Sequence, residues 1–286
     1  MDRGPDRWVR STTTSFTPIL LLLLTAAAAC SPPGDAATSN PPERNDEGPP
    51  IRVVSLDYGL TETILALGVV PVGVPDLAGY EQWVVEPELP PSVVDVGSTF
   101  EPNLELIQQL EPDLILTTPF LAGLRDRLER IAPTLSLAIY REEGEPYQRA
   151  KEVTRRLGER LDRDTEAESL IARVDSTIRA ARRQLRGHRE TPLYFVRFLD
   201  PRHVRVFGEQ SLYDDVLEKL EMPNAWTGET NYWGFSTVGI EALATRQEAR
   251  LFYLEPLPPD VLPTLENSGL WANLPFVEAG NVHPFP

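Results

Sequence analysis

The sequence predicts an α/β protein with two Rossmann-like lobes, whose mainly parallel sheets are joined by one long α-helix. Strand patterns alternate with short helical patterns from residue 51 to residue 140. They are absent from 146 to 186 and return after residue 192. The folded part therefore divides into an N-terminal lobe at 51–163, a linking helix at 164–187 and a C-terminal lobe at 188–286.

The N-terminal lobe begins with a βαβ unit. Residues 51–56 form an apolar run typical of a buried strand, residues 60–67 have apolar side chains at helical spacing, and residues 69–74 form a second strand. A helix between two strands this close predicts parallel pairing. The same pattern predicts a helix at 104–110, a strand at 114–117, a helix at 124–131 and a strand at 135–140.

The middle and the end of the chain complete the pattern. Two helical stretches meet near residues 162–164, and the second is amphipathic over roughly six turns. Ser211 has capping-box spacing to Asp214 and predicts a helix start. Further strands are predicted at 193–198, 204–207, 251–254 and 281–286. No closing helix follows the last strand, so we interpret the C-terminal lobe as truncated.

Residues 1–29 have the pattern of a lipoprotein signal peptide. Arginines precede an apolar run at 19–24, and four alanines then lead to Cys30, the single cysteine. This resembles a bacterial lipobox, so we expect Cys30 to be lipidated; the alternative is a chance cysteine in a plain signal peptide. Residues 30–50 carry the lipidated Cys and a proline-rich tether that cannot bury enough apolar surface to fold. We expect a periplasmic or cell-surface protein, lipid-anchored to a bacterial membrane.

Composition and motifs argue against several functions. The 286 residues include 27 Lys and Arg against 43 Asp and Glu, a net charge of −16, so we expect no nucleic-acid partner. One cysteine excludes a disulfide framework within the chain and a Cys-rich zinc site. The three histidines lie far apart, and the sequence has no HExxH, GxSxG, P-loop or GxGxxG motif. We therefore expect a binding protein without catalytic residues, cofactor or directly bound metal.

Aromatic side chains are the candidate binding groups. Trp233 and Phe235 belong to a loop rich in aromatic residues, Gly and Asn, where neighbouring side chains cannot all reach a core. Tyr58 and Phe120 follow predicted strands, where parallel sheets bind ligands. Trp83, Thr99 and Phe100 lie in other loops of the same lobe.

Arg197 is a charge inside an apolar strand. It requires either an acid or a ligand oxygen, and both options stay open.

Several spaced segments resemble periplasmic ferric-siderophore-binding proteins of ABC importers, with the hydroxamate branch fitting best. The segments are LALGVVPVG at 65–73, DVG at 95–97 with EPNLEL at 101–106, RIAP at 130–133, DPRH at 200–203, NAW at 224–226 with GETNYWG at 228–234, and LW at 270–271 with LPFV at 274–277. The resemblance implies two rigid lobes, one linking helix, a shallow aromatic cleft and a monomer.

The resemblance also implies roles for single residues. Tyr58, Trp83, Asn231 and Trp233 match pocket-lining positions, and Phe235 stands where a small polar residue can occur. Glu105 and Glu241 match acids that dock on arginines of the permease; the alternative is a Glu favoured in a first helical turn. The branch can carry an Arg before its Glu-Pro-Asn segment and a Tyr near Phe120. This chain has Ser98-Thr99-Phe100 and Leu121, and Arg197 would replace the missing donor.

The predicted function is capture of a ferric siderophore of hydroxamate type and its delivery to an ABC importer. Three alternatives remain. The ligand could be another chelate, such as a catecholate siderophore, haem or cobalamin. The chain could be an extracytoplasmic α/β enzyme, which would need an acid/base pair such as Asp57 with His203. It could also be a surface interaction protein unrelated to transport.

Overall fold

A computed structural model describes residues 50–84, 86–141, 144–246 and 248–285. The predicted signal peptide, Cys30 and the tether up to residue 49 lie outside this part. The described chain contains two separate five-stranded sheets, which confirms the predicted α/β class. The compact unit spans residues 51–286, and the lobe boundaries at 163 and 188 stay a prediction. No described helix combines the length and the apolar composition that a membrane span requires.

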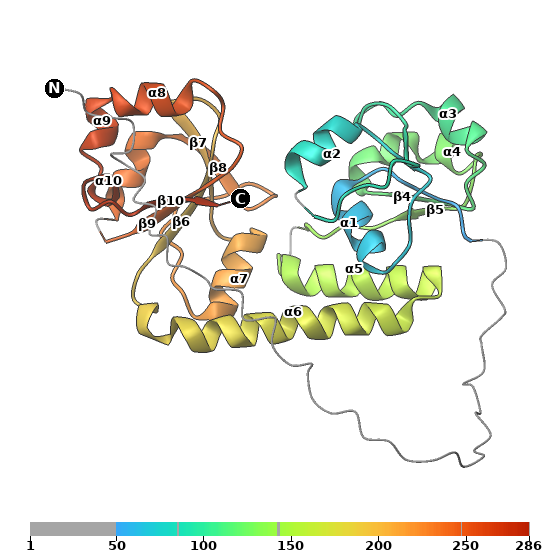
Figure 1. The fold of residues 1–286 in the computed structure, drawn as a ribbon, viewed down its shortest axis with the longest axis horizontal. Helices are drawn as coiled ribbons and strands as arrows, with labels where there is room; N and C mark the ends of the chain where they lie inside the picture. The colour runs from blue at the N-terminus through green and yellow to red at the C-terminus, as the bar shows by residue number, and fades with distance from the viewer. Residues whose placement is uncertain (1–49, 85, 142–143, 247, 286) are drawn as a thin grey trace, which may run out of the picture. The chain divides into compact units, whose positions relative to one another are not determined.

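The N-terminal sheet is entirely parallel, with the strand order β3-β2-β1-β4-β5 (Figure 1). Its strands are β1 (Val53–Ser55), β2 (Gly73–Val74), β3 (Val94–Asp95), β4 (Leu114–Thr117) and β5 (Thr134–Ser136). Its helices are α1 (Tyr58–Ala66), α2 (Leu77–Trp83), α3 (Leu104–Gln109), the 3₁₀ helix η1 (Pro119–Leu124) and α4 (Arg125–Leu128).

Both faces of this sheet are buried because alternate residues of its strands enter different cores. Val53 packs in one core with Ile64 of α1. Its neighbour Val54 packs in the other with Ile107 of α3 and Leu128 of α4. Strands covered on both sides are apolar along most of their length, as β1 and β4 are before their last residues, Ser55 and Thr117. Because of this pattern, the sequence predicted both ends of β4 correctly, at Leu114 and Thr117.

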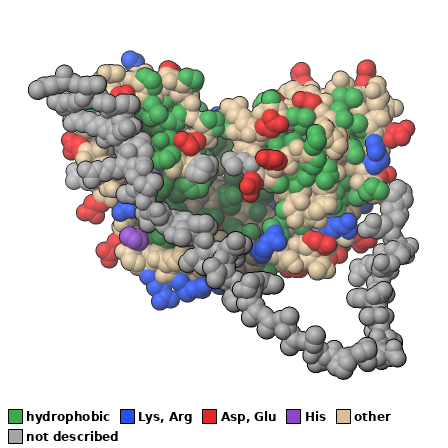
Figure 2. All heavy atoms as spheres, viewed as in Figure 1, with side chains coloured by type: hydrophobic (Ala, Val, Ile, Leu, Met, Phe, Trp, Pro, Cys, Tyr) green, Lys and Arg blue, Asp and Glu red, His purple; other side chains and the backbone are tan. Residues whose placement is uncertain are grey.

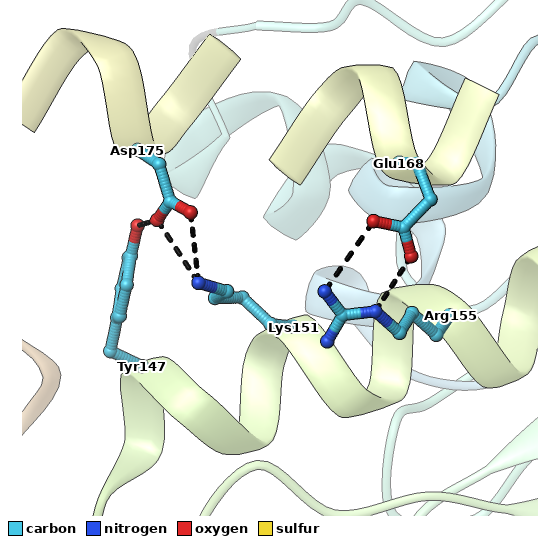
Figure 3. A network of polar contacts seen from close by, with 5 residues as sticks. All are labelled: Tyr147, Lys151, Arg155, Glu168 and Asp175. Carbon is cyan, nitrogen blue, oxygen red and sulfur yellow. Dashed lines mark hydrogen bonds and ion pairs between the residues drawn. The ribbon is translucent and has the colours of Figure 1, made fainter. Parts of the chain in front are cut away.

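Two long helices follow, α5 (Pro146–Leu161) and α6 (Asp164–Gln184), and α6 continues as the short 3₁₀ helix η2 (Leu185–His188). They meet where expected, because Asp162 has a left-handed backbone (φ 60°) that ends α5. Helix α6 packs against both α5 and α7 (Figure 1). Figure 3 shows two sets of polar contacts between α5 and α6: Tyr147 and Lys151 with Asp175, and Arg155 with Glu168.

The C-terminal sheet is mixed, with the order β10-β9-β6-β7-β8. Strands β6 (Leu193–Phe198), β9 (Arg250–Leu254) and β10 (Val282–Phe285) are parallel, whereas β7 (His203–Phe207) and β8 (Phe235–Gly239) are antiparallel additions. Its helices are α7 (Leu212–Leu220), the 3₁₀ helix η3 (Ile240–Thr245), α8 (Val261–Glu266), α9 (Gly269–Ala272) and α10 (Pro275–Glu278).

The two faces of the C-terminal sheet differ in burial. Tyr194 and Phe198 of β6 point into a core that contains Trp271 and Phe276. The alternate side chains of the same strand, Phe195 and Arg197, are only half-buried.

Some element predictions were wrong in detail. The strand expected at 135–140 lies at Thr134–Ser136, and the helix expected at 124–131 is the short α4 preceded by η1. Strands β3 and β8 and helices α2, α8, α9 and α10 were not predicted, because these segments are short and their burial depends on distant partners.

Candidate functional site

A cavity of about 680 Å³ lies at the carboxyl ends of the N-terminal strands. Its walls come from the loops that follow β1, β3, β4 and β5, and from Tyr232 and Trp233 in the segment before β8. Of the predicted site residues it contains Tyr58, Thr99, Phe100, Phe120 and Trp233. Figure 2 shows hydrophobic side chains on both sides of a hollow in this face of the molecule. The position agrees with ligand binding beyond the carboxyl ends of parallel strands.

Phe100 and Phe120 form an exposed aromatic wall. Their ring centroids are 5.5 Å apart at 65°, an edge-to-face contact. Their exposed fractions are 66% and 62%, which is unusual for phenylalanine. Exposed apolar rings that face a concavity indicate a surface that a ligand covers.

Tyr58 can contact a ligand with its ring, because its hydroxyl is already hydrogen-bonded within the chain. The hydroxyl donates to the main-chain oxygen of Asp76 at 2.9 Å and to its carboxylate at 3.1 Å. Burial, followed by the hydrogen bond to Asp76, raises the pKa of Tyr58, so the phenol is neutral at all physiological pH values. The ring also packs edge-on against Tyr80, with centroids 5.5 Å apart.

The loop before β8 holds Trp233 away from the core. The side-chain oxygen of Asn231 accepts hydrogen bonds from the backbone N–H groups of Trp233 (3.0 Å) and Phe235 (3.3 Å). Gly234 has φ +74°, and a Cβ there would lie 2.1 Å from the backbone nitrogen of Ser211. Only glycine fits this position. Trp233 is 47% exposed and stacks on Phe235, with centroids 6.1 Å apart.

Asn231 therefore shapes the loop with its oxygen, and the amide nitrogen is the group that it could present to a ligand. The hydroxyl of the neighbouring Tyr232 donates to the backbone carbonyl of Tyr140. This contact joins the loop of the C-terminal half to the cavity wall of the N-terminal half, since Tyr140 also lines the cavity.

Trp83 and Arg197 meet outside the lining of this cavity. The guanidinium carbon of Arg197 lies 3.7 Å from the centroid of the Trp83 ring. No ion pair joins Arg197 to an acid within the described part of the chain. Burial, followed by the charge of Arg205, lowers the pKa of Arg197. The aromatic partner is one that the sequence did not indicate.

The acid/base pair required by the enzyme alternative is not assembled. Asp57 accepts a hydrogen bond from the backbone N–H of Leu60 at 3.0 Å and caps α1. Burial raises the pKa of Asp57. His203 lies 2.8 Å from Asp200 and lines a different cavity, of about 760 Å³. Within the described residues, no group of three or more His, Cys, Asp or Glu side chains could hold a metal ion.

Glu105 and Glu241 occupy equivalent local positions. Each is exposed and lies in the first turn of a short helix, α3 and η3 respectively. Glu241 also lines the 760 Å³ cavity. Their docking role stays a prediction.

Sequence reasoning missed Arg205, Tyr140 and Tyr213. Arg205 had a signal, because a charge alternates with the apolar Val204 and Val206 in a short strand. The two tyrosines had none, because they are far apart in sequence and become neighbours only in the folded chain. Burial, followed by the influence of Tyr140, raises the pKa of Tyr213 to about 12.

Comparison with known proteins places the chain in a family. Residues 53–285 match the family described as periplasmic binding protein. The iron(3+)-hydroxamate-binding protein FhuD of Escherichia coli K12 is 34% identical over 237 residues, which cover 83% of this chain and 80% of that protein. The probable siderophore-binding lipoprotein YfiY of Bacillus subtilis is 26% identical and covers 82% and 74%.

A solved structure is also similar. FhuD from Vibrio cholerae with bound Fe³⁺-Desferal superposes with a TM-score of 0.77 at 32% identity, and the match covers 82% of this chain and 88% of that one. The family model spans both sheets and the loops that line the cavity. The chain is therefore a member of the periplasmic binding protein family.

Proposed function

We propose that this chain captures a ferric siderophore outside the cytoplasm and delivers it to an ABC importer. The observation that carries the proposal is the 680 Å³ cavity, with Tyr58, Phe100, Phe120 and Trp233 on its walls. Its size is within the range of small-molecule sites. Aromatic faces bury the organic shell of a chelate, and the iron arrives already ligated, so the protein needs no metal ligands of its own.

The similarity to two FhuD proteins supports a ligand of the hydroxamate class. In this proposal Asn231 and Arg197 hydrogen-bond the oxygens of the chelate, and Trp83 supports Arg197 by stacking. The chain has no enzymatic role and acts as a monomer. Lipidation at Cys30 would hold it at the membrane surface, and Glu105 and Glu241 would pair with arginines of the permease.

The proposal is tested by titrating tryptophan fluorescence of the purified protein with ferrioxamine B, ferric citrate, haem and cobalamin. We expect saturable quenching by ferrioxamine B that Trp233→Ala greatly weakens. Leu262→Ala is the matched control, because Leu262 is 45% exposed on α8 and does not line the cavity. Quenching by haem or cobalamin alone would mean that the ligand belongs to that chelate class rather than to the hydroxamates. No response to any chelate would reject the proposal.

A further inference from the structure

Two arginines face each other across the antiparallel pair β6–β7. Arg197 and Arg205 are direct cross-strand partners, so their side chains leave the same face of the sheet. This is the half-buried face, and both side chains are themselves only half-buried. Like charges directly opposite each other destabilise a sheet. The folded chain therefore keeps an arrangement that is unfavourable by itself.

The described residues do not neutralise this pair. Neither arginine forms an ion pair with an acid there, although other arginines such as Arg155 and Arg189 do. The Nε–H of Arg205 is shielded from solvent and has no hydrogen-bond partner within the described chain. A buried donor without an acceptor costs free energy, so an acceptor from outside the described chain would relieve it.

An aromatic ring lies against each guanidinium group. Arg197 lies over Trp83 at 3.7 Å, and Arg205 lies over Phe235 with its guanidinium carbon 4.8 Å from the ring centroid. Stacking occupies the face of a guanidinium and leaves its edge, where the five N–H donors lie, for a planar anion. The stacked rings thus position the donors before any ligand arrives.

The pair adjoins the cavity described above. Phe235 stacks on Trp233 at an interplanar angle of 14°, and Trp233 lines the cavity. The Tyr213 ring packs on Phe195 of β6 and Phe207 of β7, with centroids 5.1 and 4.6 Å away, two residues from each arginine. Burial raises the pKa of Tyr213 to about 12. Tyr213 is therefore a neutral hydroxyl that can donate beside the two guanidinium groups.

We propose that Arg197 and Arg205 form an anion-binding subsite, and that the chelate bound by this chain carries a carboxylate outside its iron-binding groups. This inference rests on the proposed function and narrows its ligand. A ferric trihydroxamate core has no net charge, so it leaves two positive charges uncompensated. A carboxylate provides two acceptor oxygens in one plane, which match the edges of the guanidinium groups.

A matched ligand series tests the inference. Ferrioxamine B carries a terminal ammonium group, its N-acetyl derivative is neutral there, and its N-succinyl derivative ends in a carboxylate. All three have the same iron centre. For the wild-type protein, calorimetric titration should give the tightest binding for the succinyl form. We expect about ten- to a hundredfold between it and the ammonium form, which is the effect of hydrogen bonds to a charged group.

Arg197→Met and Arg205→Met should remove this preference while each keeps an apolar stem against its ring. Arg127→Met is the matched control, because Arg127 is exposed on α4 and the substitution changes the net charge equally. Arg205→Met without ligand should unfold at the same temperature as the wild type or higher, because it relieves repulsion. A clear fall in the unfolding temperature of Arg205→Met would indicate that Arg205 has a structural role, and it would overturn the inference.

The remaining outcomes separate the two proposals. Equal binding of the three derivatives by the wild-type protein, or a succinyl preference that survives in Arg197→Met and Arg205→Met, would refute the anion subsite and leave siderophore capture intact. Binding of none of the three would instead reject capture of this chelate class, and the subsite with it.

Discussion

Replacing Asp175 by Ala should lower the free energy of unfolding by about 2 kcal/mol, because Asp175 ties α6 to α5 at a single carboxylate. The Tyr147 hydroxyl donates to Oδ1 at 2.6 Å, and the Lys151 ammonium lies 2.9 Å from Oδ2 (Figure 3). Tyr147 also donates its backbone N–H to Asp215 of α7 at 2.8 Å. Helices α5, α6 and α7 thus meet around one tyrosine.

The magnitude follows from the two interactions that the substitution removes. A hydrogen bond to a charged group contributes about 1.5–3 kcal/mol. In the ion pair with Lys151, the Lys151 side chain is 19% exposed and the Asp175 side chain is 28% exposed. This pair adds about 0.2–1 kcal/mol after screening by solvent. Water that enters the space left by the carboxylate can hydrogen-bond the remaining groups, so the net loss of unfolding free energy is smaller than the sum of the two contributions. Tyr147→Phe removes only the hydroxyl and its hydrogen bond to the carboxylate, so it should cost about 1.5–2 kcal/mol.

Urea unfolding of the wild type, both single variants and the double variant at pH 7 measures the coupling. We expect a coupling free energy of about 1–2 kcal/mol between positions 147 and 175. Arg155→Ala is the matched control on the same pair of helices. Its pair with Glu168 has side chains 47% and 61% exposed (Figure 3), so its loss should cost under about 1 kcal/mol.

The pH dependence gives a second check. The Tyr147 hydrogen bond, followed by that of Lys151, lowers the pKa of Asp175. A carboxyl with a lowered folded-state pKa stabilises the protein above its unfolded value of about 3.9, and this contribution disappears as the pH falls through the folded value. The stability difference between wild type and Asp175→Ala should therefore shrink below about pH 4. Additive variants at pH 7, or a difference that is unchanged at pH 3, would refute the reasoning.

Three further predictions concern the site. Gly234→Ala should destabilise the protein by about 1–3 kcal/mol and weaken chelate binding, because φ +74° and the contact with Ser211 exclude a Cβ; chemical unfolding and fluorescence titration measure both. Phe100→Ala should leave the unfolding temperature nearly unchanged and weaken chelate affinity about two- to tenfold by calorimetry, because its ring is mostly exposed and contacts Phe120, which is itself exposed. Glu105→Lys combined with Glu241→Lys should abolish growth on the ferric chelate as iron source, in cells that depend on this protein, without changing the affinity for the chelate in vitro. Normal growth of this double variant would refute the docking role.

Much of the fold could be predicted because it depends on local patterns. Strands buried on both faces, such as β4, are continuous apolar runs that no distant contact needs to explain. The start of α7 was predicted from Ser211, whose side chain accepts from the backbone of Asp214 at 3.0 Å. The short β8 had no such pattern, since its side chains are half-buried or exposed and its pairing with β7 defines it.

The sequence by itself determined the α/β class, the break between α5 and α6, and the strand-end positions of Tyr58 and Phe120 at the cavity. These follow from periodicity and from the rule that parallel strands present their carboxyl ends together. Only the tertiary structure decided that Arg197 stacks on Trp83, 114 positions away, and that it stands opposite Arg205. Register and packing set such contacts, and both depend on the whole chain rather than on neighbours in sequence.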